Sequence, residues 1–330
     1  MSIYTDQTYQ KLRQLVEKQA GQKLPGEREL ANQLGIPRAA LRGLLDALEM
    51  EGLVRRQQGS GTYAMDTQVQ QLRTVVLLID DELKLGEDPF FSLLVEHLQL
   101  CLQEQNISCM IERINQHWQP QQLRDGAITL GQAGKTVLAR LQKDTPPVVS
   151  LLLDAKLPAR VSASIFQLAD HEAGSEAAQR LLTLHCQRVL FIGRRDLAAS
   201  RERLFGIEEV LSEANILLQF VPCAQNYTAG LRLGQGLPLP QEEGPIGIIA
   251  ANDWLAVGLR AGLSSRSSAN LPTLHLISFD GLSITADTFL HIEALVAPLQ
   301  TIASDAVAEL HRLPTSASGR VVRYPFHWRV

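Results

Sequence analysis

The chain has 330 residues, 45% of them apolar and 20% charged, a length that fits two or three domains and a composition that excludes disordered and collagen-like proteins. Its longest purely apolar runs, such as residues 75–79 and 246–251, are far shorter than the roughly 18 residues that cross a bilayer, and the N-terminus lacks the basic and apolar pattern of a secretory signal. The four cysteines are scattered and form no C-x-x-C pair, so we expect a cytoplasmic protein with reduced cysteines, no metal, no cofactor and no membrane partner.

Charge is distributed unevenly along the chain. Residues 1–65 contain nine Lys and Arg against seven Asp and Glu, a net charge of +2, whereas the remaining residues carry a net charge of −6. This asymmetry indicates a small module that faces a polyanion, attached to a larger module that does not.

Helical periodicity divides the first 65 residues into three segments. Apolar residues recur from Tyr9 to Val16, a second helix is predicted at 27–34, and a third at 37–49. On the third helix the leucines share one face, and Arg38 and Arg42 lie one turn apart on the opposite face. An alternating segment at 53–64 with a Gly-Ser-Gly centre then predicts a β-hairpin, so the segment has the pattern of a winged helix-turn-helix domain.

The same segment resembles the GntR-family DNA-binding domain. The resemblance rests on the runs 24–31 (LPGERELA), 34–38 (LGIPR), 51–54 (EGLV) and 59–63 (GSGTY), in this order and without gaps. It implies that Arg28, Arg38 and Arg42 contact DNA and that Gly59, Ser60 and Gly61 form the tip of the wing. For Arg55 and Arg56, phosphate contact and plain solvation remain equally open.

After a short polar linker at 66–72, the chain alternates apolar strands with amphipathic helices. Strands are predicted at 75–79, 127–130, 148–153, 189–192, 246–250 and 274–279. This pattern predicts an α/β fold with doubly wound parallel sheets, and its length predicts two lobes with a cleft between them. Polar residues follow several strands, at the sheet edge where such folds bind ligands, and carboxylates, an arginine and aromatic rings suit a polyhydroxylated ligand.

This larger segment looks like the effector domain of the lactose-repressor (LacI/GalR) family, which has a periplasmic-binding-protein-like type I fold. The motifs that carry the resemblance include 88–91 (DPFF), 200–206 (SRERLFG), 251–258 (ANDWLAVG) and 277–280 (ISFD). It implies that the effector site contains these residues: Phe90, Phe91, Asp154, Arg203, Tyr227, Asn252 and Asp280. It also implies three crossings between lobes, with residues 73–158 and 297–316 in the first lobe and 159–296 and 317–330 in the second.

Several of these residues have a structural alternative. Asn252 is equally compatible with ligand contact and with capping the following helix, Asp253 is expected to be a helix cap, and Trp254 is expected in the core. Residues 80–82 are expected to form a solvated loop, and Arg203 could be an ordinary surface arginine. The run 131–136 (GQAGKT) suggests a phosphate-binding loop, but its glycine spacing is wrong and nucleotide hydrolysis is excluded.

The sequence therefore predicts a transcription factor, a repressor and not an enzyme, that acts as a homodimer on a double-stranded DNA operator. A small polar effector, most simply a sugar or sugar derivative, would bind between the lobes and control operator affinity. The alternatives are a solute-binding or sugar-processing protein with an unrelated N-terminal module, and a constitutive DNA binder that has lost its ligand.

Overall fold

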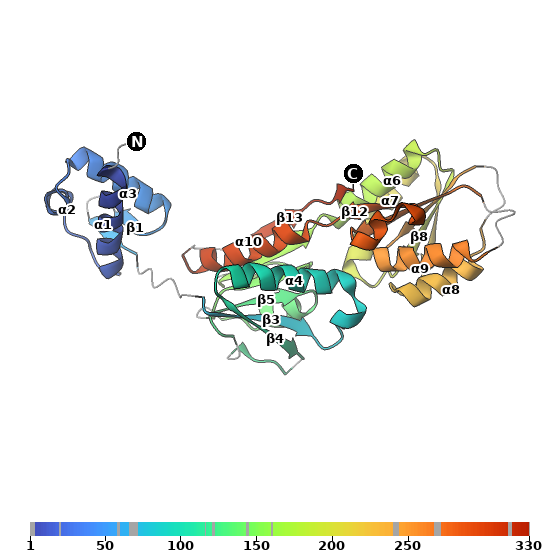
Figure 1. Cartoon of the computed structure of the whole chain (residues 1–330), viewed down its shortest axis with the longest axis horizontal. Helices are drawn as coiled ribbons and strands as arrows, with labels where there is room; N and C mark the ends of the chain where they lie inside the picture. The colour runs from blue at the N-terminus through green and yellow to red at the C-terminus, as the bar shows by residue number, and fades with distance from the viewer. Residues whose placement is uncertain are drawn as a thin grey trace.

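The computed structural model describes residues 4–19, 21–57, 60–65, 72–115, 117–120, 123–142, 145–159, 161–239, 244–266, 272–315 and 319–329. They form a small N-terminal domain and two α/β lobes (Figure 1). Among these residues, no helix is both long enough and apolar enough to cross a membrane. Residues 66–71 of the expected linker at 66–72 and the expected wing residue Gly59 lie outside the described residues.

The N-terminal domain consists of three helices followed by a two-stranded antiparallel hairpin, as predicted. The elements are α1 (Tyr4–Lys18), α2 (Glu27–Leu34), α3 (Arg38–Met50), β1 (Val54–Gln57) and β2 (Gly61–Ala64). Helix α2 ends at Gly35, which adopts a left-handed φ of 64°, and α3 begins directly after Pro37. Leu41, Leu45 and Leu48 of α3 are fully buried in a core that also includes Leu12 and Leu30, so the predicted leucine face packs inward.

The first lobe is built on a six-stranded sheet with the strand order β13-β7-β6-β5-β3-β4, and every neighbouring pair in it is parallel. Its strands are β3 (Thr74–Asp80), β4 (Ser108–Ile114), β5 (Gly126–Leu130), β6 (Val148–Leu151), β7 (Ala163–Leu168) and β13 (Val321–Tyr324). Helices α4 (Pro89–Glu104) and α10 (Leu299–Arg312) pack together on one face and α5 (Ala133–Leu138) packs on the other. Alternate residues of β3 point to the two faces, which explains why this strand is buried throughout.

The second lobe repeats this architecture with the strand order β14-β12-β11-β10-β8-β9. Its strands are β8 (Arg188–Gly193), β9 (Leu217–Pro222), β10 (Ile246–Ala250), β11 (Leu274–Asp280), β12 (Ile292–Val296) and the antiparallel edge strand β14 (His327–Trp328). Helices α6 (Asp170–Thr183) and α7 (Ala198–Glu213) cover one face, and α8 (Tyr227–Gly236) and α9 (Asp253–Ser264) cover the other.

The chain passes between the lobes three times, but two of the expected boundaries are wrong. Strand β7, expected in the second lobe, pairs with β6 in the first lobe, and β13, also expected in the second lobe, pairs with β7. The crossings therefore lie at 168–170, 296–299 and 324–327. Both boundaries shift for the same reason: β7 is a mostly buried strand that continues the first sheet, and β13 forms its hydrogen bonds with β7. Only the crossing near residue 297 lies where the sequence analysis placed it.

Candidate functional site

The exposed face of α3 carries two arginines that share one carboxylate. The side chains of Arg38 and Arg42 are 58% and 60% exposed, and their guanidinium groups lie 3.6 and 2.9 Å from the Glu27 carboxylate at the start of α2. The two guanidinium groups thus share a single carboxylate. Arg28 is exposed on the next residue of α2.

The hairpin lies beside this face. Ser60 is half-buried, with its hydroxyl 2.7 Å from that of Tyr63, and Gly61 has a φ of 120°, which a residue with a Cβ rarely adopts. Arg56 bonds internally, with Asp46 of α3 at 2.7 Å, so it holds the hairpin against α3. Arg55 is exposed and remains available to a ligand.

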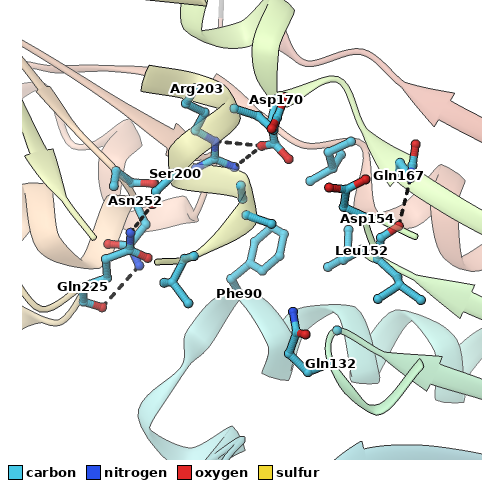
Figure 2. Close-up of a pocket in the computed structure, with 18 of the residues that line it drawn as sticks. Phe90, Gln132, Leu152, Asp154, Gln167, Asp170, Ser200, Arg203, Gln225 and Asn252 are labelled. Atoms are coloured by element: carbon cyan, nitrogen blue, oxygen red, sulfur yellow. Dashed lines mark hydrogen bonds and ion pairs between the residues drawn. The ribbon is translucent and has the colours of Figure 1, made fainter. Parts of the chain in front are cut away.

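The second candidate site is a cleft of about 530 Å³ (Figure 2). Its lining includes residues that follow strands of both sheets. Residues from the first lobe include Phe90, Gln132 and Asp154, and residues from the second include Arg203 and Asn252. The carboxyl ends of parallel strands are where α/β sheets bind ligands. Two lining residues, Leu152 and Asp280, have left-handed backbone conformations with φ of 57° and 105°, and such strain concentrates at binding sites.

Arg203 is the central cation of the cleft, and it is buried, with a side chain only 6% exposed. Its Nε donates to Asp170 at 2.8 Å, its Nη1 donates to the Ala251 carbonyl at 2.6 Å, and the guanidinium lies 4.4 Å from the centroid of the Phe279 ring. Burial raises the pKa of Asp170, and the positive charge of Arg203 opposes that shift. The alternative of an ordinary surface arginine is therefore wrong.

Two aspartates of the second lobe lie close together, Asp280 in the lining of the cleft and Asp253 outside that lining. Burial raises the pKa of Asp253 to about 6, although its carboxylate accepts hydrogen bonds from the Ser278 hydroxyl and from the Leu282 amide. Burial and the negative charge of Asp253 raise the pKa of Asp280 well above its ordinary value. The expected helix cap at Asp253 is wrong, because the residue that caps α9 is Asn252.

Asn252 combines both roles that its position suggested. Its Oδ1 accepts from the Leu255 amide at 2.9 Å and caps α9, its Nδ2 donates to the Gln225 carbonyl, and the residue lines the cleft. Gln225 in turn donates a hydrogen bond to Ser200. This network fixes three polar side chains on one wall of the cleft, as the dashed lines of Figure 2 indicate.

Six of the seven expected effector contacts line the cleft, namely Phe90, Phe91, Asp154, Arg203, Asn252 and Asp280. Tyr227 is not among the lining residues; its ring packs against Trp254 at 5.6 Å between centroids, and its backbone packs against α9. Asp80 and Glu82, expected in a solvated loop, do line the cleft.

Other polar residues of the lining were not predicted as contacts, and they include Asp88, Gln132, Gln167, Asp170, Ser200 and Gln225. Three of them follow recognisable signals. Gln132 lies in the run that suggested a phosphate-binding loop, and Asp88 and Ser200 lie in motifs already cited. Gln167 lies in β7, a strand that was not predicted. Asp170 lies in the run 170–174 (DHEAG), a further part of the resemblance to the LacI/GalR effector domain, but it was given no role.

Comparison with known proteins divides the chain at the same place as the fold. Residues 4–64 match the model of the gntR family of bacterial regulatory proteins. Over 62 residues the chain is 40% identical to a putative L-lactate dehydrogenase operon regulatory protein of Escherichia coli strain K12, an alignment that covers 18% of this chain and 24% of that protein. The chain thus spans about a quarter of the length of that curated relative. It is also 24% identical over 185 residues to the HTH-type transcriptional regulator AscG of the same strain, covering 52% of this chain and 54% of AscG.

Solved structures of similar fold cover the two lobes. One is a LacI family transcriptional regulator from Enterococcus faecium with bound ribose, 19% identical, with a TM-score of 0.64 over 78% of this chain and 97% of that one. Another is the transcriptional regulator CelR in complex with cellobiose, 18% identical, with a TM-score of 0.60 over 93% of this chain and 99% of that one. The N-terminal domain is thus a GntR-like DNA-binding domain, and the two lobes have the fold of LacI-type regulators.

Proposed function

We propose that this chain is a DNA-binding transcriptional repressor whose operator affinity is controlled by a small polyhydroxylated effector bound between the lobes. The observation that carries the proposal is the presence in one chain of a GntR-like domain with two exposed arginines on α3 and of a ligand-sized cleft between two lobes. A volume of about 530 Å³ lies in the range of small-molecule sites.

For the DNA-binding half, Arg38 and Arg42 are the proposed base or phosphate contacts from α3. Arg28 and the hairpin residues Gly59, Ser60 and Gly61 are the proposed contacts to the backbone. Duplex DNA offers a dense row of negatively charged phosphates, which can compete electrostatically with Glu27 for both guanidinium groups. A homodimer would present two such domains to a pseudo-palindromic operator.

For the effector half, Phe90 and Phe91 would cover the apolar face of the ligand. The carboxylates of Asp154 and Asp280 would accept hydrogen bonds from its hydroxyl groups, and the amide of Asn252 would form hydrogen bonds with them as well. Tyr227 is left out of this site. Arg203 would act mainly by positioning, because its donors already bind Asp170 and Ala251. Ligand contact with both lobes gives the effector a means of changing their relative position.

Electrophoretic mobility shift on the DNA upstream of the gene, repeated at 50 and 200 mM salt, tests the proposal. We expect a shifted band that weakens steeply with salt. Arg38→Ala and Arg42→Ala should each lose on the order of 1–3 kcal/mol of binding free energy. Lys18→Ala, a cation at the end of α1, is the matched control. The absence of a salt-sensitive band would favour a solute-binding protein instead, whereas full affinity in both arginine variants would remove the assignment of Arg38 and Arg42 as DNA contacts.

A further inference from the structure

The walls of the cleft carry far more negative than positive charge. Eight carboxylates line it, and three arginines. The carboxylates are Asp80, Glu82, Asp88, Asp154, Asp170, Glu172, Glu202 and Asp280. The lining contains no lysine among the described residues.

Each arginine of the lining already has a carboxylate partner. Arg203 pairs with Asp170 at 2.8 Å, Arg323 with Glu172 at 3.6 Å, and Arg194 with Asp196 outside the cleft. The arginines of the walls are therefore already paired with carboxylates of the protein itself. A phosphorylated or carboxylated ligand would find no unpaired arginine among the described lining residues and would face several carboxylates.

Five of the lining carboxylates have no cationic partner within 4.0 Å among the described residues, namely Asp80, Glu82, Asp88, Asp154 and Asp280. Asp88 follows the 3-10 turn before α4, Asp154 follows β6, and Asp280 ends β11, so they come from both lobes. Asp280 is only 7% exposed, and burial and the charge of Asp253 raise its pKa although the positive charge of Arg203 and a hydrogen bond from the Asp253 amide oppose that shift. A buried carboxylate that faces a cavity with so few donors is costly unless a ligand supplies positive charge or donors.

Asp88 and Asp280 lie on opposite sides of the cleft and repel each other. The negative charge of Asp88 raises the pKa of Asp280, and burial raises the pKa of Asp88. Closure of the lobes would increase this repulsion unless a cation lay between the two carboxylates. A metal ion does not fit, because no group of three or more metal-ligating side chains occurs among the described residues. An ammonium group suits a pair of carboxylates, because it carries a positive charge and three N–H donors.

The other walls suit the rest of a sugar. Phe90 points into the centre of the cleft, and the amides of Gln132, Gln167, Gln225 and Asn252 surround it (Figure 2). Building on the proposed function, we propose that the effector is a polyhydroxylated molecule with a protonated amine, of the amino-sugar class, and that its ammonium group lies between Asp88 and Asp280.

Isothermal titration calorimetry of the full-length protein with matched sugars tests this assignment. Each set contains a hexosamine, its parent hexose, its N-acetyl derivative and the hexose 6-phosphate, in the gluco, galacto and manno series. In one series the hexosamine should bind at least tenfold more tightly than the other three. Asp88→Asn should reduce this preference to less than threefold, since asparagine retains the cap of α4 but not the charge.

Asp280→Asn should reduce the preference in the same way, and Glu213→Gln, an exposed carboxylate at the end of α7, should leave it unchanged. The assignment is overturned if a parent hexose or a phosphate binds as tightly as the amine, if both variants keep the full preference, or if no hexosamine binds. Salt-sensitive DNA binding, measured on the same preparation, tests the regulator proposal separately and survives any of those results.

Discussion

Arg203 illustrates what a motif can and cannot predict for a single residue. The motif places it correctly at the cleft, but its partner Asp170 is 33 residues away, at the start of α6 and directly after a crossing between lobes that was expected elsewhere. Removing the guanidinium leaves Asp170 buried without compensation, so Arg203→Ala should lower the free energy of unfolding by about 3–5 kcal/mol. Urea denaturation measures this loss, and an unchanged midpoint would contradict the structural role. Asn252→Ala is therefore the better variant for effector binding.

Glu309, in α10, gives a second prediction at this scale. Burial alone would raise the pKa of Glu309, but hydrogen bonds from Arg312 and Ser164 and the charges of Arg312 and Arg320 outweigh burial and lower it. A lowered folded-state pKa stabilises the protein above the ordinary value of 4.5, and this contribution is lost as pH falls through the folded-state pKa.

Urea unfolding at pH 7 and pH 4 tests this. The wild type should lose more stability between the two than Glu309→Gln, which carries no titrating group there. At pH 7 the variant should be less stable by about 1–3 kcal/mol, because charged hydrogen bonds are lost. Parallel pH dependence in the two proteins would argue against the role of Glu309.

At the scale of elements, most buried strands were predicted, but the buried strands β7 and β12 and the edge strands were not. Strands β3, β8 and β10 contain continuous apolar runs and β11 is rich in apolar residues, which makes these strands recognisable in the sequence. The edge strands β4 and β9 have mostly exposed and half-buried residues, so their composition gives no such signal. Helix α8 was missed as well, because its glycines look like loop residues in sequence.

Those glycines instead allow α8 and α9 to pack closely. A Cβ on Gly258 would lie 2.1 Å from the Tyr227 carbonyl oxygen, and one on Gly234 would lie 2.4 Å from that of Leu259. Gly258→Ala should therefore destabilise the second lobe by about 1–3 kcal/mol through overpacking. Gly236→Ala, at the open end of α8, meets nothing within 4 Å and should be neutral or slightly stabilising. Thermal unfolding compares the two, and equal Tm values would contradict close helix packing as the reason for Gly258.

At the scale of the whole molecule, the number of domains and the two lobes followed from length, charge asymmetry and the strand–helix rhythm. The lobe boundaries could not be predicted in this way. The lobe to which β13 belongs depends on its pairing with β7, a segment about 150 residues earlier in the chain. Charge pairing inside the cleft was equally beyond the sequence, since it depends on which carboxylates the arginines already occupy.

The account requires that the cleft and the DNA-binding domain communicate. By linkage, an effector that changes DNA affinity must itself bind DNA-bound and free protein differently. The most direct measurement is fluorescence anisotropy of a labelled upstream DNA fragment, titrated with full-length protein, with and without a saturating sugar shown by calorimetry to bind. We predict a change in the Kd for DNA of at least about fivefold, absent in an Asn252→Ala protein that no longer binds the sugar. A bound sugar that leaves the Kd for DNA unchanged would contradict the account.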